Sequence, residues 1–481
     1  MLNLILGKTP FVKTEYVRQL VAERAKNGER CIIIVPEQFS YETEKSMLDL
    51  VGAQNMLFVD VLSMTRLAQL ILSEHADPEE KPEADDGVKM MTMSLALEKL
   101  GDKLQIYRKY TARPQLIAEL VSFATELKQW TVSVDSLDEF SKNAKASSLK
   151  SKLDELVMIL SLYNTMLEKS YYNTDDKLTR LSSVLSECRY FEDKIVAIDG
   201  FTRFTKQEYA VVDRILAQSP QTYITFDSDG GKDGYSLFAN NNRQVELLKS
   251  LANKSSVKIA SIKYVEADFD DTEVFKSLSE GAFCPEFAVS DVSCDGKIKI
   301  VSAPNKADEC EFVAMSIKRL MREKNVRCRD IAVLQRSEGS YDKELSSAFK
   351  RYGVPFYEDA RQAVANEPLA VYLTSLLEIA CNGLNTDVLM RHLKTGLSSL
   401  TADEISKLEN YAFVWRISSA QWRNDFTENP SGFGNKLSDF DRNTLRYLNS
   451  LREKAVAPVL AFKEDFSQAE NEKKAEVIYD Y

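Results

Sequence analysis

Short apolar runs and helical patterns alternate over the first 75 residues. Leu2–Leu6 is apolar except for Asn3 and Cys31–Val35 is wholly apolar, which is typical of parallel strands buried on both faces. A third run covers residues 57–61, and Ser63 is the expected N-cap of the helix that follows it. Between the runs, apolar residues recur at helical spacing. This alternation predicts an α/β fold with a doubly wound parallel sheet.

The pattern becomes helical after an acidic, proline-bearing stretch at residues 77–86. From residue 88 to about residue 185, apolar stripes recur at helical spacing, which predicts a helical insertion within the α/β domain. The sheet is expected to resume with strands at Ile195–Asp199 and at residues 222–226, separated by a helix that starts at Lys206.

A second α/β pattern follows acidic residues around positions 266–280, which we expect to have little regular structure. Strands are predicted at residues 297–302 and 330–334 and helices at 306–322 and 341–352, after which the segment 353–357 follows. From residue 368 onward the pattern is all-helical. The predicted domains are a first α/β domain at 1–75 and 186–290, a helical insertion at 76–185, the start of a second α/β domain at 291–367, and a helical insertion at 368–481.

Composition narrows the possible partners. The 481 residues carry a net charge of −11, which argues against a surface coated with nucleic acid but leaves room for a local basic groove. No apolar run approaches the ~18 residues of a membrane helix, so no membrane partner is expected. The seven cysteines are scattered without a C-x-x-C pair, and only two histidines are present. We therefore expect no Cys/His metal site, reduced thiols and a cytoplasmic location.

The segment after the first apolar run has the frame of a phosphate-binding loop. Gly7, Lys13 and Thr14 stand where the pattern G-x-x-x-x-G-K-[ST] requires them. The second glycine is replaced by Val12, and Pro10 has no N–H to offer a phosphate. Two interpretations stay open: a degenerate nucleotide site that uses Gly7, Lys13 and Thr14, or an ordinary strand–loop–helix connection.

Asp199 ends an apolar strand, where a P-loop enzyme would hold magnesium. The next residue is Gly200, so the glutamate that activates water in an active motor is missing. Asp199 is either a relict metal ligand or a carboxylate that caps the next turn. No catalytic residue is predicted, and binding of ATP or Mg²⁺ is doubtful.

The ordered set of local strings resembles a known family. The layout resembles superfamily 1 helicases, which have two RecA-like domains with P-loop NTPase-type parallel sheets and helical insertions, and residues 331–336 (IAVLQR) are similar to one of their strand motifs. The closer resemblance is to the N-terminal half of AddB, also called RexB, the non-motor member of the bacterial AddAB helicase–nuclease. It rests on the strings at residues 35–41, 63–68, 199–208 and 302–311.

The resemblance implies a function in DNA repair. In that family AddA is the ATP-driven motor, while AddB holds the 3′-ended strand and scans it for the Chi sequence during double-strand break resection and homologous recombination. The implied partners are single-stranded and duplex-end DNA and an AddA-type motor/nuclease subunit in a heterodimer. The family's exonuclease domain and iron–sulfur cluster lie outside this chain, which we expect to be a fragment.

The resemblance also implies a set of DNA-binding residues. Two matched positions, Met64 and Gln69, carry aromatic side chains in the best-known branch of the family. For Phe201 and Phe204 the alternative is an ordinary core position, and for Gln38 a helix start. The predicted DNA-binding residues are Gln38, Ser40, Met64, Arg66, Gln69, Phe201 and Phe204.

The predicted function is therefore a non-motor, helicase-like DNA-binding segment. Arg66 could hold a phosphate and Gln38 could pair with a base edge. The alternatives are a divergent active P-loop ATPase or helicase, and a protein-interaction scaffold whose DNA channel has decayed.

Overall fold

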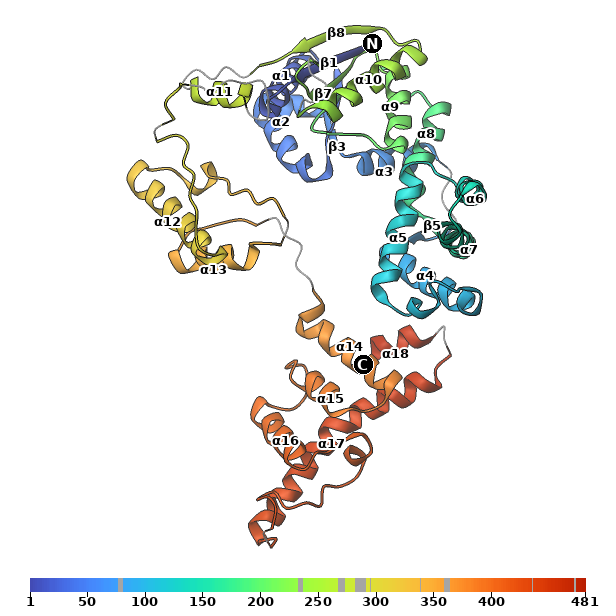
Figure 1. Ribbon diagram of the computed structural model, residues 1–481, viewed down its shortest axis with the longest axis vertical. Helices are drawn as coiled ribbons and strands as arrows, with labels where there is room; N and C mark the ends of the chain where they lie inside the picture. Colours follow the sequence, from blue (N-terminus) through green and yellow to red (C-terminus); the bar gives the residue numbers. More distant parts are fainter. Residues whose placement is uncertain are drawn as a thin grey trace. The chain divides into compact units, whose positions relative to one another are not determined.

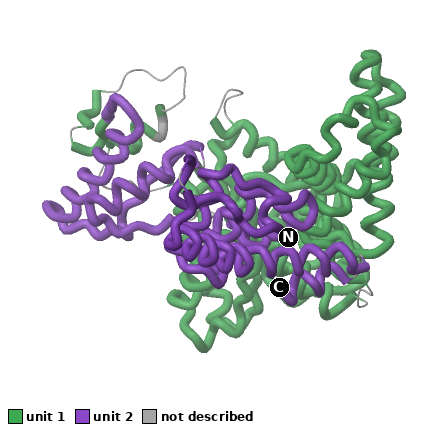
Figure 2. Tube along the Cα trace, turned by 90° about the horizontal axis from the view of Figure 1, so that it is seen from below, with its two compact units in different colours: residues 1–299 green, residues 300–481 purple. Residues whose placement is uncertain are grey.

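A computed structural model of the chain divides into two compact units, residues 1–299 and residues 300–481 (Figure 2). Each unit is described by itself. The residues that the structure describes are 1–76, 81–231, 237–266, 273–281, 291–294, 296–337, 339–358, 364–434, 436–470 and 473–481.

The first unit is built around a parallel sheet (Figure 1). The sheet has six strands in the order β3-β2-β6-β7-β1-β8. The inner strands are mostly apolar because both faces of the sheet are covered. Leu4 and Ile5 illustrate this, since they contact the cores on opposite faces. The strands are β1 (Leu2–Gly7), β2 (Arg30–Ile34), β3 (Val59–Leu62), β6 (Lys194–Ile198), β7 (Thr222–Asp227) and β8 (Ile259–Tyr264).

Helices cover both faces of this sheet. Helices α1 and α2 pack on one face, and α3, α8, α9 and α10 pack on the other. The predicted α/β fold with a parallel sheet is thus confirmed in this unit. The helices are α1 (Pro10–Lys26), α2 (Ser40–Asn55), α3 (Met64–His75), α8 (Lys177–Glu187), α9 (Lys206–Gln218) and α10 (Ala239–Lys254).

A helical bundle is inserted between α3 and α8. It contains α4 (Asp86–Leu100), α5 (Pro114–Gln129), α6 (Val134–Asn143), α7 (Ser147–Ser170) and a short ladder of β4 (Glu83–Ala84) with β5 (Tyr172–Asn173). The amide of Gln207 on α9 donates to the carbonyl of Asp175 and to Oγ1 of Thr179, each at 2.9 Å. These bonds tie the end of the insertion to the sheet domain.

The described part of the second unit consists of helices and extended segments. Helices α12 (Lys306–Lys324) and α13 (Asp342–Tyr352) pack against each other. A separate helical core surrounds the fully buried Trp422. Its helices are α14 (Pro368–Asn382), α15 (Thr386–Leu393), α16 (Ala402–Val414), α17 (Asp439–Gln468) and α18 (Lys474–Asp480).

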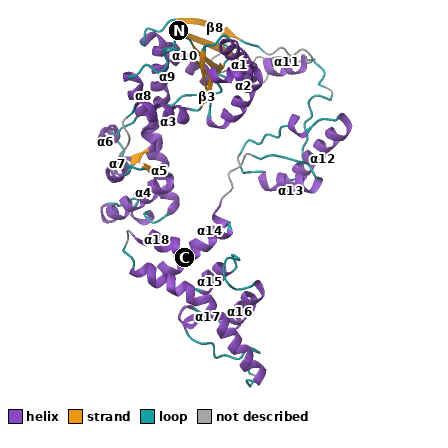
Figure 3. Ribbon diagram, turned by 180° about the vertical axis from the view of Figure 1, so that it is seen from behind, coloured by secondary structure: helices purple, strands orange, loops and turns teal. Residues whose placement is uncertain are grey.

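Two sequence predictions of strands, at residues 297–302 and 330–334, were wrong. Neither segment contains an assigned strand, and the strands of the described residues all precede residue 265 (Figure 3). Ile300 is 95% exposed and Leu334 is 94% exposed. An apolar pattern favours extended backbone, but a strand also needs a neighbour whose N–H and C=O groups pair with it. Those partners are not among the described residues of this unit.

Two predicted linkers fall partly outside the described residues. Within the segment at 266–280, expected to have little regular structure, residues 273–281 form helix α11 (Glu273–Gly281), and residues 267–272 are not described. Of the acidic stretch at 77–86, residues 77–80 are not described. The finer domain boundaries stay predictions.

Candidate functional site

The predicted DNA-binding residues all lie along one edge of the sheet. Because the six strands are parallel, their carboxyl ends share an edge, which we call the carboxyl edge, and ligands of such sheets bind there. The strands β3, β2 and β6 are neighbours in the sheet. Gln38 and Ser40 follow β2; Met64, Arg66 and Gln69 follow β3; Phe201 and Phe204 follow β6.

Contacts between the three connections bring these residues together. Nε of Arg66 lies 4.0 Å from Oε1 of Glu37 in the connection after β2. Gly200 has a φ of 79°, which a side chain would strain, and a Cβ there would lie 3.4 Å from Cδ of Pro36 and 3.6 Å from Cδ2 of Phe39. The positive φ accounts for the glycine, and a Cβ at these distances would make only ordinary contacts with Pro36 and Phe39, so the β6 connection lies beside the β2 connection.

Three of the predicted residues offer polar groups at the surface. Gln38 and Gln69 are exposed, and the side chain of Arg66 is 55% exposed. Two further surface residues, Phe39 and Tyr41, were not predicted, and Tyr41 is 78% exposed. The signal was available in the string Phe39-Ser40-Tyr41, because aromatic residues beside amides are typical of surfaces on which bases stack.

Two other predicted residues belong to the hydrophobic core. Met64 is 6% exposed and Phe204 is 1% exposed. The ring of Phe204 lies 5.2 Å from that of Phe201 and 5.4 Å from that of Tyr209, with Phe226 nearby. Burial raises the pKa of Tyr209 to about 12, so its hydroxyl stays protonated and donates to Gln244 at 2.7 Å. Phe201 is partly buried and packs against this cluster of aromatic side chains.

Ser40 is buried, and its hydroxyl has no hydrogen-bond partner among the residues that the structure describes. The residue is the first of α2 and is 5% exposed. A buried hydroxyl without a partner costs about 1–3 kcal/mol, so such groups in folded proteins call for an explanation. Its position in the connection after β2 makes Ser40 a group that a bound ligand could satisfy.

The carboxyl edge also collects the N-terminal ends of helices. Ser63 accepts a hydrogen bond from the backbone N–H of Arg66 at the start of α3, and Thr205 forms a capping box with Glu208 at the start of α9. Helix N-termini carry partial positive charge and favour anions. Arg203, exposed just before α9, adds a cation that the sequence analysis did not select. The edge is thus suited to a polyanion.

The loop after β1 has a different character. Lys13 is 2% exposed, and its Nζ donates to the carbonyl of Gly7 at 2.9 Å and lies 2.7 Å from Oδ1 of Asp227. Thr14, the third residue of the predicted nucleotide site, is partly buried on α1. The sequence analysis did not select Asp227, which lies far away along the chain and ends the neighbouring strand β7.

Asp199, the predicted relict magnesium ligand, is already engaged. It is 5% exposed, and its Oδ1 accepts a hydrogen bond from Oγ1 of Thr225 at 2.5 Å. Among the residues that the structure describes, no group of three His, Cys, Asp or Glu side chains is placed to hold a metal ion. Mg²⁺ prefers several oxygen ligands in octahedral geometry, which Asp199 and Gly200 do not supply.

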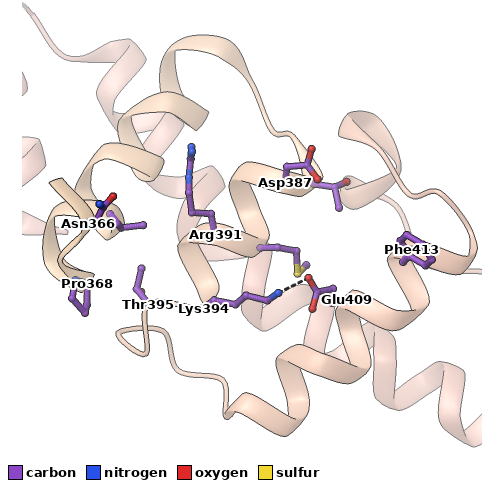
Figure 4. Close-up of a pocket in the computed structure, with 11 residues that line it drawn as sticks. Asn366, Pro368, Asp387, Arg391, Lys394, Thr395, Glu409 and Phe413 are labelled. Carbon is purple, nitrogen blue, oxygen red and sulfur yellow. Dashed lines mark hydrogen bonds and ion pairs between the residues drawn. The ribbon is translucent and has the colours of Figure 1, made fainter. Parts of the chain in front are cut away.

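A pocket of about 560 Å³ lies in the second unit, between α14, α15 and α16 (Figure 4). It contains none of the predicted site residues. Its two cations are paired: Nζ of Lys394 lies 2.5 Å from Oε1 of Glu409, and Arg391 pairs with Glu378. The pocket is therefore close to neutral, and it gives no charge argument for a phosphate-bearing ligand.

The parallel sheet, its strand–loop–helix frame after β1 and the inserted helical bundle define the class of protein, a RecA-like fold of the P-loop type. Two family models agree with this class. The model described as "ADDB, N-terminal" matches residues 4–279, and the model described as "UvrD-like helicase C-terminal domain" matches residues 239–476. The chain belongs to the ADDB N-terminal family, and its fold is of the helicase type.

Curated relatives are named as the B subunit of an ATP-dependent helicase/deoxyribonuclease. The protein from Thermoanaerobacter sp. (strain X514) is 28% identical over 100% of this chain and 43% of its own length. The protein from Clostridium novyi (strain NT) is 28% identical over 98% of this chain and 41% of its own length. The chain thus spans less than half the length of these relatives. In the part of the chain that the structure describes, no helix is both long and apolar enough to cross a membrane.

Proposed function

We propose that the carboxyl edge at β3, β2 and β6 binds single-stranded DNA, and that the chain does so as part of an AddB-type subunit without hydrolysing ATP. The observation that carries this proposal is the convergence of three connections on one surface, joined by the approach of Arg66 to Glu37 and of Gly200 to Phe39. The names of the relatives and the family match support a role in helicase–nuclease repair of DNA, with an AddA-type motor as partner.

Each group on this surface has a role that a single strand requires. Arg66 is exposed and can pair with a phosphate, and Gln38 and Gln69 can bond to base edges. Phe201 and Phe39 offer faces on which bases stack. The buried hydroxyl of Ser40 would gain a partner when a strand binds. Scanning for a Chi-type sequence is the finer part of the proposal, because amide side chains can discriminate between bases.

The test is fluorescence anisotropy of a labelled single strand with the full chain, at two salt concentrations. We expect binding that weakens with salt, and Arg66→Ala should weaken it and reduce the salt dependence of log K by about 0.7. The matched control is Arg189→Ala. Arg189 is an exposed arginine, 2.8 Å from Glu192, in the connection before β6 at the opposite edge of the sheet.

The same titration separates the alternative functions. Binding that requires Mg-ATP and is lost in Lys13→Ala would favour a divergent ATPase. Equal losses in Arg66→Ala and Arg189→Ala would mean that the strand does not use the carboxyl edge. No binding under any condition would overturn the proposal for this chain and favour a protein-interaction scaffold. Sequence recognition is tested by comparing strands of one length and varied sequence.

A further inference from the structure

The loop after β1 lacks the shape of a phosphate cradle. The chain passes from Gly7, the last residue of β1, to Pro10, the first residue of α1, through Lys8 and Thr9 alone. Thr9 is extended, with φ −102° and ψ 115°, and residues 7–14 contain no positive φ. A backbone nest that binds phosphate needs successive N–H groups in alternating right- and left-handed conformations. Pro10 also removes one N–H where the cradle would begin.

The lysine that would reach a nucleotide already has partners inside the protein. In a phosphate loop this lysine contacts the β- and γ-phosphates. Here Nζ of Lys13 bonds to the carbonyl of Gly7 and to the carboxylate of Asp227, and the side chain is 2% exposed. The side chain of Asp227 is 29% exposed, so the carboxylate reaches solvent whereas the ammonium of Lys13 does not. An approaching phosphate would meet the carboxylate first.

The space above Gly7 is filled by backbone. A Cβ at Gly7 would lie 2.1 Å from the carbonyl oxygen of Val265, and the N–H of Val265 donates to the carbonyl of Leu6 at 2.7 Å. The carbonyl of Gly7 also accepts from the N–H of Ser228 at 3.0 Å. The absence of a side chain at Gly7 therefore allows the backbone just after β8 to lie directly against the loop. The ends of β1, β7 and β8 meet around the buried ammonium.

We propose that the Lys13–Asp227 ion pair takes the place of nucleotide phosphates, as an internal latch that holds the ends of β1, β7 and α1 together. The residues present do not fit ATP, and the loop does not bind it. This inference does not depend on DNA binding by the other half of the carboxyl edge. In a phosphate loop this lysine contacts the nucleotide phosphates, whereas in this chain it contacts Asp227 and the carbonyl of Gly7.

The first experiment is calorimetric titration of the full wild-type chain with Mg-ATP, together with thermal unfolding in its presence. At about 5 mM Mg-ATP we expect no saturable heat and no rise in Tm, because a ligand stabilises a protein only if it binds the native state. Saturable binding that is lost in Lys13→Met and kept in Lys8→Met would overturn the proposal. Lys8 is the matched control, since it is an exposed lysine of the same loop.

The second experiment tests the latch by a double-mutant cycle of Lys13→Met and Asp227→Asn, read as Tm. Each single variant should have a lower Tm than the wild type, because it leaves one member of the pair without its partner. The double variant removes both charges, so its loss of Tm should be smaller than the sum of the two single losses. Strict additivity would overturn the latch. If a single variant fails to fold, the wild-type titration still decides the nucleotide question. A failure of DNA binding would leave both results unchanged.

Discussion

The carboxylate of Glu37 should weaken DNA binding, so removing its charge should make single-stranded DNA bind more tightly. The carboxylate of Glu37 lies 4.0 Å from Nε of Arg66, and the two side chains are 63% and 55% exposed. If Arg66 holds a phosphate, Glu37 competes for the same guanidinium and also repels the strand. Glu37→Gln keeps the shape of the side chain and removes only the charge. We therefore expect the variant to bind single-stranded DNA more tightly than the wild type.

The magnitude follows from the distance and the exposure. Two unit charges 4 Å apart interact by about 1 kcal/mol in water, and exposed ion pairs contribute about 0–1 kcal/mol. Release of Arg66 should therefore tighten binding by up to about fivefold at ~0.1 M salt. At ~1 M salt, where the Debye length falls from about 10 Å to about 3 Å, the gain should largely vanish.

The assay is a strand titration of four proteins: wild type, Glu37→Gln, Arg66→Ala and the double variant. Glu192→Gln is the control, because Glu192 is paired with Arg189 at the opposite edge of the sheet. Glu37→Gln should tighten binding more where Arg66 is present than in the Arg66→Ala background, where only the direct repulsion of the strand is relieved. Weaker binding in Glu37→Gln, or the same gain in the Arg66→Ala background, would refute the competition between Glu37 and DNA for Arg66.

Three further predictions concern stability. The carboxylate of Glu155 is 5% exposed and accepts hydrogen bonds from the backbone N–H groups of residues 105–107. Glu155→Gln should therefore lower the free energy of unfolding, measured in urea, by about 2–3 kcal/mol. A loss under ~0.5 kcal/mol would contradict this. Phe204→Ala truncates a core side chain and should lower the free energy of unfolding by about 3–5 kcal/mol. Phe201→Ala should lower it much less, but should weaken the binding of single-stranded DNA. Burial lowers the pKa of His392 below 6.5 in the folded chain. On acidification the imidazole is therefore protonated first in the unfolded chain, and the folded state loses stability. Between about pH 7.5 and about pH 5.5, Tm should drop less in His392→Gln than in the wild type.

The first unit could be predicted from sequence because its inner strands are buried on both faces. Runs such as Cys31–Val35 leave little alternative to a central parallel strand, and Ser63 caps α3 as predicted. Strand β8 was missed because it lies at the edge of the sheet and five of its six residues are exposed. Its sequence, IASIKY, contains apolar residues, but they do not form a continuous run like Cys31–Val35. In the second unit an apolar pattern at Ile300 and Leu334 marked extended backbone without a pairing strand.

The sequence indicates where the candidate site lies, but it does not indicate which of the site residues are exposed and which are buried in the core. Local strings identify the connections at the carboxyl edge, because a residue's place after a strand is a local property. Whether Phe204 or Phe201 reaches the surface depends on Tyr209 and Phe226, which pack beneath them. Likewise, no local pattern pairs Lys13 with Asp227, since their contact follows from β1 and β7 being neighbours in the sheet.

The two halves of the carboxyl edge differ in how each cation is neutralised. Both halves lie at the positive ends of helices, so backbone dipoles alone do not decide where an anion binds. At β7, β1 and β8 the ammonium of Lys13 is buried against Asp227, and Val265, just after β8, lies against Gly7. At β3, β2 and β6 the guanidinium of Arg66 is exposed, and its only neighbouring carboxylate among the described residues, Glu37, stands 4.0 Å away in solvent. A polyanion can displace an exposed partner at little cost, whereas displacing Asp227 would strand a buried charge. A sheet built in this way can lose nucleotide binding and keep strand binding, and the ATP and DNA titrations test the two halves separately.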